Sequence, residues 1–229
     1  QYTSGSTSEP KGVVISHRNL AHNLKIIVHN LQASTSTIVV SWLPLYHDMG
    51  LIGSYLGCLF CGGSGFYLSP LSFIRNPVLW VELISRHRGT HMQAPNFAYA
   101  LVARKYLARR PAPTLDLSCV QHMINAAEPV HELDIERFYA VFEASGLPRR
   151  VFPTYGLAEH TVFVCSNGRQ VLTVDKSLLE RERKVVLLQD SEAAGAMRVV
   201  GCGFPGEAEG VEVEIVNEEG VALGQGRVG

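Results

Sequence analysis

The sequence predicts an α/β protein in which a mostly parallel sheet is flanked by helices, followed by the start of a smaller β-rich subdomain. Three observations predict it. Hydrophobic residues make up 46% of the 229 residues and charged residues 18%, which suffices for a buried core. Up to about residue 165, short apolar runs alternate with segments of helical period. Beyond that point the patterned segments are mostly short and strand-like.

The core strands are expected where β-branched and other apolar residues form short runs, at residues 13–15, 37–43, 66–68, 91–94, 120–125 and 151–152. The helices between them are expected at residues 17–31, 49–61, 76–86, 97–108 and 130–144. Ser16 is a typical N-cap for the first helix, and Pro77 follows Asn76 at the start of the third. Such alternation is typical of a parallel sheet, whose ligands bind at the carboxyl ends of the strands.

One uncharged stretch, residues 49–74, is nominally long enough to cross a bilayer. It contains many glycine and serine residues as well as Pro70, so a buried helix, a glycine turn and a short strand explain it better. We therefore expect this stretch to belong to the folded core.

The last third of the chain has a different pattern, with only residues 176–183 suggesting a helix. Short strands are expected at residues 171–174, 185–188, 197–200 and 211–216. We predict a domain boundary after residue 165. Residues 166–229 would then form an insertion-like segment and a truncated β-rich subdomain.

Charge and cysteine usage exclude several classes of protein. The net charge of −1 argues against a general binder of nucleic acid or of anionic membranes. Five cysteines without regular spacing do not form a disulfide framework, which favours a reducing compartment and a cytoplasmic location. The chain has no signal peptide and no initiator Met, so we expect a piece of a longer protein, with its organelle targeting and oligomeric state open.

Residues 3–12 carry the strongest local signal for chemistry. They hold five hydroxyl side chains, two glycines and Lys11. Such a loop can turn backbone N–H groups, hydroxyls and one cation toward a polyphosphate. It is not a Walker loop, because no glycine precedes Lys11 and no Ser or Thr follows it. An ordinary polar surface loop is the alternative.

Two further motifs each follow an expected strand. In residues 154–159 an aromatic side chain, a glycine and a carboxylate share one short turn, which suits base stacking and Mg²⁺ held against phosphate. In residues 42–50, His47 and Asp48 form a polar pair among apolar neighbours. His47 is either a core histidine with satisfied hydrogen bonds or a group at the mouth of a pocket.

Together, in this order and spacing, the three motifs resemble the adenylate-forming (AMP-binding) superfamily of acyl-CoA synthetases, peptide-synthetase adenylation domains and luciferases. The resemblance covers essentially the whole chain. Residues 42–50, 95–99 and 155–159 look most like one branch, the fatty acyl-AMP ligases, and residues 166–198 look like the insertion of that branch. The resemblance implies an internal fragment of the family's large N-terminal domain. It also implies that residues 1–165 bind a nucleotide and an acyl chain.

The implied reaction is attack of a fatty acid carboxylate on the α-phosphate of ATP, giving an acyl-adenylate and pyrophosphate. Residues that would contact the nucleotide are Thr3, Ser4, Gly5, Ser6, Thr7, Lys11, Asn125, Ala126, Ala127, Glu128, Thr154, Tyr155 and Gly156. Lys11, His47 and Glu159 would act in catalysis, with Glu159 holding Mg²⁺. His47, Asn96 and Phe97 would contact the acyl substrate.

The resemblance also implies partners and leaves alternatives open. The partners would be a fatty acid and an acyl carrier protein domain, with no nucleic acid and no integral membrane association. An acyl-CoA synthetase uses the same first step. Ser8, Ala126 and His160 depart from common residues of the family, so a non-catalytic nucleotide- or acyl-binding module in a scaffold is a further alternative. The ribose-binding aspartate and the C-terminal domain with its catalytic lysine are expected beyond Gly229. We therefore expect these residues alone to be poorly active.

Overall fold

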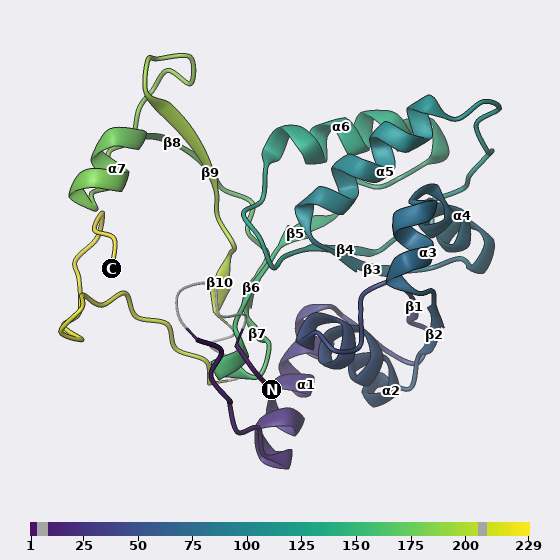
Figure 1. Cartoon of the computed structure of the whole chain (residues 1–229), viewed down its shortest axis with the longest axis horizontal. Coiled ribbons are helices and arrows are strands. Elements are labelled where there is room, and N and C mark those ends of the chain that lie inside the picture. The colour runs from purple at the N-terminus through teal and green to yellow at the C-terminus, as the bar shows by residue number, and fades with distance from the viewer. Residues whose placement is uncertain (4–8, 206–209) are drawn as a thin grey trace.

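The computed structural model describes residues 1–3, 9–205 and 210–229, and its centre is a parallel sheet of five strands (Figure 1). The strand order is β2-β1-β3-β4-β5, and every neighbouring pair runs parallel. The strands are β1 (Ile38–Ser41), β2 (Ser64–Tyr67), β3 (His91–Ala94), β4 (His122–Asn125) and β5 (Val151–Pro153). The predicted α/β class and the mostly parallel sheet are confirmed.

Helices cover both faces of this sheet. The helices of the core are α1 (His17–Asn30), η1 (Met49–Leu56), α2 (Gly57–Cys61), α3 (Pro70–Arg75), α4 (Val78–His87), α5 (Asn96–Ala108) and α6 (Glu132–Phe142). In Figure 1, α5 and α6 pack together on one side of the sheet, whereas α1 and α2 lie on the other. A short 3₁₀ helix, η2 (Glu143–Ser145), follows α6. Consecutive strands are joined through helices, as parallel pairing requires.

The start of α1 shows how the sequence sets an element. The Asn19 N–H donates to Ser16 Oγ at 3.2 Å, and the Ser16 N–H donates to Asn19 Oδ1 at 3.0 Å. These reciprocal bonds satisfy two backbone donors that a helix start leaves unpaired. The helix then buries Leu24, Ile26 and Ile27 on one face. The predicted N-cap and helix are confirmed.

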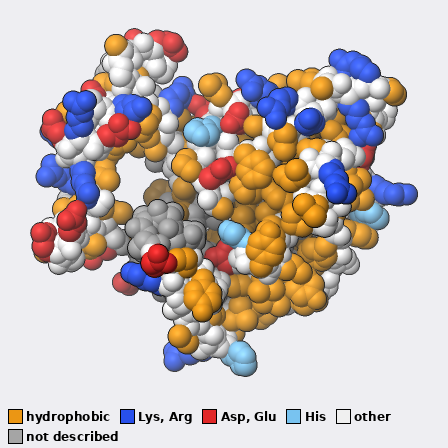
Figure 2. Space-filling view, viewed as in Figure 1, with side chains coloured by type: hydrophobic (Ala, Val, Ile, Leu, Met, Phe, Trp, Pro, Cys, Tyr) orange, Lys and Arg blue, Asp and Glu red, His pale blue; other side chains and the backbone are white. Residues whose placement is uncertain are grey.

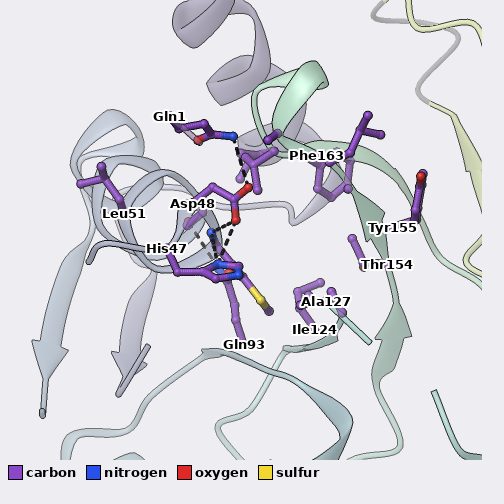
Figure 3. A pocket seen from close by; sticks show the side chains of 18 of the residues that line it. Gln1, His47, Asp48, Leu51, Gln93, Ile124, Ala127, Thr154, Tyr155 and Phe163 are labelled. Atoms are coloured by element: carbon purple, nitrogen blue, oxygen red, sulfur yellow. Dashed lines mark hydrogen bonds and ion pairs between the residues drawn. The ribbon is translucent and has the colours of Figure 1, made fainter. Parts of the chain in front are cut away.

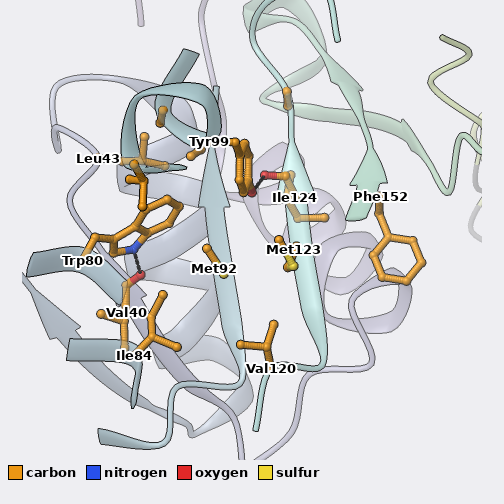
Figure 4. Packing of buried hydrophobic residues seen from close by; sticks show 14 of the residues in the cluster. Val40, Leu43, Trp80, Ile84, Met92, Tyr99, Val120, Met123, Ile124 and Phe152 are labelled. Atoms are coloured by element: carbon orange, nitrogen blue, oxygen red, sulfur yellow. Dashed lines mark hydrogen bonds between the residues drawn. The ribbon is translucent and has the colours of Figure 1, made fainter. Parts of the chain in front are cut away.

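Aromatic side chains fill the core between the sheet and its helices (Figure 4). The Trp42 ring stacks on Phe73 with centroids 3.9 Å apart. Trp80 Nε1 donates to the Val40 carbonyl at 2.9 Å, and the Tyr99 hydroxyl donates to the Ile124 carbonyl at 2.7 Å. Large apolar area is thus buried while these polar atoms keep partners. The bonds fix α4 and α5 against strands β1 and β4.

The uncharged stretch confirms the core interpretation but in a different helical form. Residues 49–61 are helical as predicted, yet η1 is a π-helix that passes into α2. Proline and serine then begin an additional helix, α3, that the sequence pattern did not predict. Within the described residues, no helix has the length and apolar character needed to span a membrane.

The strand predicted at residues 13–15 is wrong. Residues 11–13 instead run antiparallel to residues 1–3: the Val13 N–H donates to the Gln1 carbonyl at 2.7 Å, and the Thr3 N–H donates to the Lys11 carbonyl at 3.0 Å. Val14 is 92% exposed, so this apolar run has no sheet to be buried in. The two paired segments flank residues 4–8.

The C-terminal part forms two small antiparallel sheets. One has the order β10-β7-β6, from β6 (Tyr155–Gly156), β7 (Phe163–Ser166) and β10 (Phe204–Pro205). The other pairs β8 (Val171–Asp175) with β9 (Ala196–Val200), and helix α7 (Lys176–Glu182) follows β8. The predictions for residues 171–174, 176–183 and 197–200 are confirmed. The domain boundary stays a prediction, and β7 runs across it.

Two predicted strands are absent from this part. Residues 185–188 and 211–216 contribute only isolated bridges, such as Val174 with Leu187 and Val216 with Ala222. Val213, Ile215 and Val216 are exposed. The first of these segments, residues 185–188, does lie beside β8, since the Asp175 N–H donates to the Val186 carbonyl at 3.0 Å and the Leu188 N–H donates to the Thr173 carbonyl at 2.8 Å. This pairing gives one bridge and not a regular strand.

One face of the core leaves apolar side chains exposed (Figure 2). They come from α2, β2 and α3, and they are Leu59, Phe60, Phe66, Tyr67, Leu71 and Ile74. This is the face opposite the C-terminal sheets in Figure 1.

Candidate active-site cleft

A cleft of about 720 Å³ opens at the carboxyl ends of the sheet strands; we call it the main cleft. Its walls come from the antiparallel pair of segments 1–3 and 11–13 (the N-terminal hairpin), the segment after β1, the ends of β4 and β5, and the turn after β6. It brings together nine of the predicted site residues: Thr3, Lys11, His47, Ala126, Ala127, Thr154, Tyr155, Gly156 and Glu159. Figure 3 shows Gln1, Asp48 and His47 on one side, with Ala127, Thr154 and Tyr155 across from them.

The N-terminal hairpin positions Lys11 in the wall of the main cleft. The Lys11 N–H donates to Thr3 Oγ1 at 3.0 Å, in addition to the backbone pairing of the same two residues. Both residues belong to the segment 3–12, for which the sequence predicts phosphate binding. The predicted ligands Ser4, Gly5, Ser6 and Thr7 lie outside the described residues.

Residues 154–159, which follow β5 and include β6, supply an aromatic face and a carboxylate. Tyr155 is 50% exposed in β6, and Glu159 lies in the 3₁₀ helix η3 (Ala158–His160). Gly156 has a structural cause, because a Cβ there would lie 1.8 Å from the Val162 carbonyl oxygen. Thr154 is buried, and its hydroxyl bonds the Phe152 carbonyl at 3.0 Å and Ser166 Oγ at 2.8 Å. Thr154 therefore fixes the turn from behind.

Buried Asn23 holds the same turn against α1. Its Nδ2 donates to the Phe163 carbonyl at 2.9 Å, and its Oδ1 accepts from the Phe163 N–H at 3.0 Å. Asn23 is 2% exposed, so both bonds are shielded from water. The Tyr155–Glu159 wall is thus tied to the first helix of the chain.

His47 and Asp48 form an ion pair in the cleft wall. His47 Nδ1 lies 2.9 Å from Asp48 Oδ1. The same carboxylate accepts from the Met49 N–H at 2.7 Å and from Gln1 Nε2 at 3.3 Å. Gln1 Nε2 also donates to the Thr161 carbonyl at 2.9 Å, which links the pair to the loop after η3.

These bonds shift the pKa values of both groups. The hydrogen bond to Asp48 raises the pKa of His47, against the opposing effect of burial. Burial acts to raise the pKa of Asp48, but the bonds from His47, Met49 and Gln1 outweigh it and lower that pKa. The carboxylate therefore stabilises the protonated form of His47 more than water stabilises that of a free histidine.

Four predicted site residues do not line the main cleft. Asn96 is 2% exposed and lies behind it. Its Nδ2 donates to Asp134 at 2.9 Å, and its Oδ1 accepts from Asn125 Nδ2 and from the His131 N–H, each at 3.0 Å. Glu128 accepts from the Phe97 N–H at 2.6 Å, at the start of α5. The ligand contacts assigned to these residues stay predictions, and their bonds in the structure fix the loop after β4.

Some cleft residues carried no signal in the sequence. Gln93, at the end of β3, donates to the Gly53 carbonyl in η1 at 3.3 Å, and both line the main cleft. Gln1 connects the cleft wall through side-chain bonds to Asp48 and to the Thr161 carbonyl, which no short motif encodes. Only the strand-end position of Gln93 could have indicated it. The apolar part of the lining includes Ile27, Leu31, Met49, Leu51, Ile124 and Phe163.

A metal could be held by Glu159 with few other protein ligands. The described residues contain no group of three or more His, Cys, Asp or Glu side chains arranged to hold a metal ion. Mg²⁺ commonly takes one or two carboxylates and completes its shell with phosphate oxygens and water. A single cleft carboxylate such as Glu159 fits that mode of binding.

Relatives of this chain are ligases. It is 40% identical over 222 residues to a medium-chain-fatty-acid–[acyl-carrier-protein] ligase of Moorena producens, covering 95% of this chain and 37% of that protein. It is 37% identical over 238 residues to a long-chain-fatty-acid–AMP ligase of Mycobacterium marinum, covering 100% of this chain and 37% of the relative. The chain thus spans little more than a third of these relatives.

Solved structures agree with the fold. A fatty acid AMP ligase from Legionella pneumophila matches with a TM-score of 0.89 at 36% identity, over 99% of this chain and 40% of that one. A fatty acyl-adenylate ligase from L. pneumophila, in complex with acyl adenylate and pyrophosphate, matches with a TM-score of 0.86 at 37% identity. That match covers 96% of this chain and 38% of the other. A family model described as AMP-binding enzyme matches residues 1–229, and the chain therefore belongs to the AMP-binding enzyme family.

Proposed function

We propose that the protein to which these residues belong activates a fatty acid with ATP, giving an acyl-adenylate and pyrophosphate. The observation that carries the proposal is the convergence of three motifs, distant in sequence, on one cleft: the hairpin with Lys11, the segment with His47, and the turn with Tyr155 and Glu159. Relatives named fatty acid–AMP ligases and acyl-carrier-protein ligases support it.

The first task of such a site is to offset charge. A carboxylate approaching a triphosphate is repelled, by about 4 kcal/mol for two unit charges about 4 Å apart at an effective dielectric constant of about 20. Lys11 in the cleft wall would neutralise phosphoryl oxygens, and Thr3 stands beside it. The nucleophile is already ionised, so no general base is needed, and charge stabilisation is the main contribution of these residues.

The second task is to hold the nucleotide. Tyr155 offers a half-exposed ring for stacking on adenine. Ala126 and Ala127 border the same cleft, and their small side chains leave room for a base. Ala127 has φ of 70°, a conformation that non-glycine residues rarely adopt, so the loop after β4 holds a defined shape there.

Mg²⁺ belongs to the same proposal. Glu159 would hold the ion, which would screen phosphate charge when bound. This assignment is supported by the carboxylate's position in the cleft lining, close in sequence to Tyr155.

We assign the acyl carboxylate to the side of His47. The imidazolium ion of His47 would face the reacting carboxylate and would draw it toward the nucleotide. Asp48 pairs with the ring, and Gln1 in turn donates to the Asp48 carboxylate. The apolar lining from α1 and η1 would receive the start of the acyl chain, which suits a fatty acid better than a small polar acid.

The final acceptor is proposed to be an acyl carrier protein. The support is the acyl-carrier-protein ligase of M. producens at 40% identity. An acyl-CoA synthetase would share the cleft and the first step, so the acceptor has to be measured.

The test is ATP–pyrophosphate exchange by the full-length protein, with and without a fatty acid. We expect exchange that depends on the fatty acid, and acylation of a holo-carrier protein without efficient release of acyl-CoA. Exchange together with efficient acyl-CoA formation would replace the carrier by CoA. The absence of exchange across a range of acyl chain lengths would leave only a binding module.

A further inference from the structure

A second cavity, of about 780 Å³, lies beyond the free edge of the parallel sheet. We call it the edge cavity. Its lining residues come from the edge strand β5, helix α6 and the end of α1, with one residue each from β8 and β9. It shares no lining residue with the main cleft, and none of the sequence motifs points to it.

The charges around the edge cavity do not balance. Its lining contains three arginines and two glutamates: Arg149, Arg150, Arg169, Glu132 and Glu136. Both acids are already paired, Glu136 with Arg149 and Glu132 with Arg198. No carboxylate among the described residues pairs with the two remaining arginines. Arg150 and Arg169 therefore leave two positive charges facing one cavity.

These two arginines reach the cavity from different parts of the chain. Arg150 directly precedes β5, and Arg169 lies two residues before the start of β8. The Arg169 guanidinium lies 5.7 Å from the centre of the Phe152 ring. Both side chains are exposed at the cavity, so the charges are accessible to a ligand.

A buried histidine completes this wall. His122 is 6% exposed, and its Nδ1 has no hydrogen-bond partner within the part of the chain that the structure describes. Its ring is stacked between His91 and Phe152, with centroids 5.3 Å and 4.5 Å away. Burial and the charges of His91 and Arg150 lower its pKa to about 4, so the ring is neutral at pH 7. His122 therefore adds no positive charge to this wall, and its unpartnered Nδ1 is a polar atom shielded from solvent.

From these observations we propose that the edge cavity binds the oxyanion of a small organic acid, a phosphate ester or a carboxylate, between Arg150 and Arg169 and beside His122. Planar guanidinium groups match both oxyanions with paired N–H donors. Apolar walls would take the body of the ligand, and they include Val130, Ile135, Phe152, Val171 and Val200. The proposal does not depend on the activity proposed for the main cleft.

The experiment follows the imidazole signals of the full-length protein by NMR during titration with inorganic phosphate and, separately, with hexanoate. The His122 signal is assigned by its loss in His122→Phe, which keeps a stacked ring. We expect at least one anion to shift this signal. Arg150→Gln and Arg169→Gln should each weaken that binding about tenfold or more, because each removes a charge-assisted contact. The anion that binds more tightly identifies the class of ligand.

Adjacent residues provide the matched controls. Arg149→Gln removes a charge from the same lining, but one already paired with Glu136 and lying over Tyr139, so we expect less than about a twofold change. Lys11→Ala should leave the His122 shift intact, since Lys11 belongs to the main cleft. The proposal is overturned if neither anion shifts the His122 signal, or if Arg149→Gln weakens binding as much as the other two variants.

Discussion

Polar side chains behind the main cleft and polar side chains on its walls have different surroundings. Asn23 and Asn96 are each 2% exposed and are bonded to the backbone or to other side chains, where they join α1, α5 and the strand-end loops. Lys11 and Glu159 are exposed in the cleft wall and reach it from the N-terminal hairpin and η3. The first group supports the second, so substitutions in the two groups should affect different properties.

The largest expected effect is a loss of adenylation activity when residues of the cleft wall are substituted. In the full-length protein, Lys11→Ala and Glu159→Ala should each reduce adenylation about 100-fold or more, because each removes a preorganised charge contact with the nucleotide or its metal. The melting temperature should stay close to that of the parent. Adenylate formation and thermal unfolding check the two expectations.

Exposed Lys25 on α1 is the matched control for Lys11. It lies outside the lining of the main cleft, so Lys25→Ala should leave adenylation unchanged. Full activity in Lys11→Ala or Glu159→Ala would remove that residue from its proposed role.

The next largest effect is on stability and belongs to the framework. Asn23→Ala leaves the Phe163 N–H and carbonyl without partners in a buried setting, which should cost about 2–4 kcal/mol of unfolding free energy. Urea-induced unfolding measures this cost. Asn30→Ala on the same helix removes only a bond to the Ile26 carbonyl, so it should cost about 1 kcal/mol or less. Equal costs for the two variants would mean that Asn23 does not tie the turn to α1.

A third prediction concerns the His47–Asp48 pair. The pair lines the main cleft, as Lys11 and Glu159 do, and it is also hydrogen-bonded to other residues, as Asn23 and Asn96 are. Asp48→Asn removes the negative charge and leaves only a neutral acceptor, so the His47 pKa should fall back toward 6.5. NMR titration of the His47 ring measures the shift. An unchanged His47 pKa in Asp48→Asn would show that the two side chains do not form this pair in solution.

The pH dependence of the pair has a definite sign. His47 has a raised pKa in the folded protein. Its contribution to the free energy of unfolding is therefore complete below pH 6.5, and it is lost as the pH rises through the folded-state pKa, which lies above 6.5. Asp48 has a lowered pKa, so its contribution is present above pH 3.8 and is lost only as the pH falls through a lower value. The alkaline limb of adenylation activity should therefore move to lower pH in Asp48→Asn, by an amount that kcat/KM profiles record.

The smallest effect is expected from a surface ion pair remote from both groups. Arg109 and Glu82 are 2.7 Å apart, and both are partly exposed. Arg109→Gln should change the unfolding free energy by less than about 1 kcal/mol and should leave adenylation unchanged. A large loss of activity in this variant would show that the distinction between wall, framework and surface is too simple.

The sequence allowed the framework to be predicted further than the cleft. Periodicity and capping identified α1, and short apolar runs identified the strands of the parallel sheet, because burial directly selects these residues. The motif positions of Lys11, His47 and Glu159 could be predicted because the order and spacing of the three motifs resemble those of the adenylate-forming superfamily. The roles of Gln1 and Gln93 were not legible, since each depends on a contact with a residue at least 40 positions away.

Errors in the predictions arose where an apolar pattern had no partner surface. Residues 13–15 and 211–216 look like strands in isolation, yet Val14 and Val213 are exposed. Asn96 and Glu128 are a different case, because the ligand contacts assigned to them stay predictions. The structure gives both residues hydrogen bonds within the framework, at the loop after β4 and at the start of α5.

The most direct test of the central claim is a crystal structure of the full-length protein with a non-hydrolysable acyl-adenylate analogue. Our account predicts one nucleotide in the main cleft, with adenine on Tyr155, the phosphate mimic beside Thr3 and Lys11, and the acyl carbonyl toward His47. A nucleotide bound elsewhere, with Tyr155 and Lys11 not in contact with it, would contradict the account.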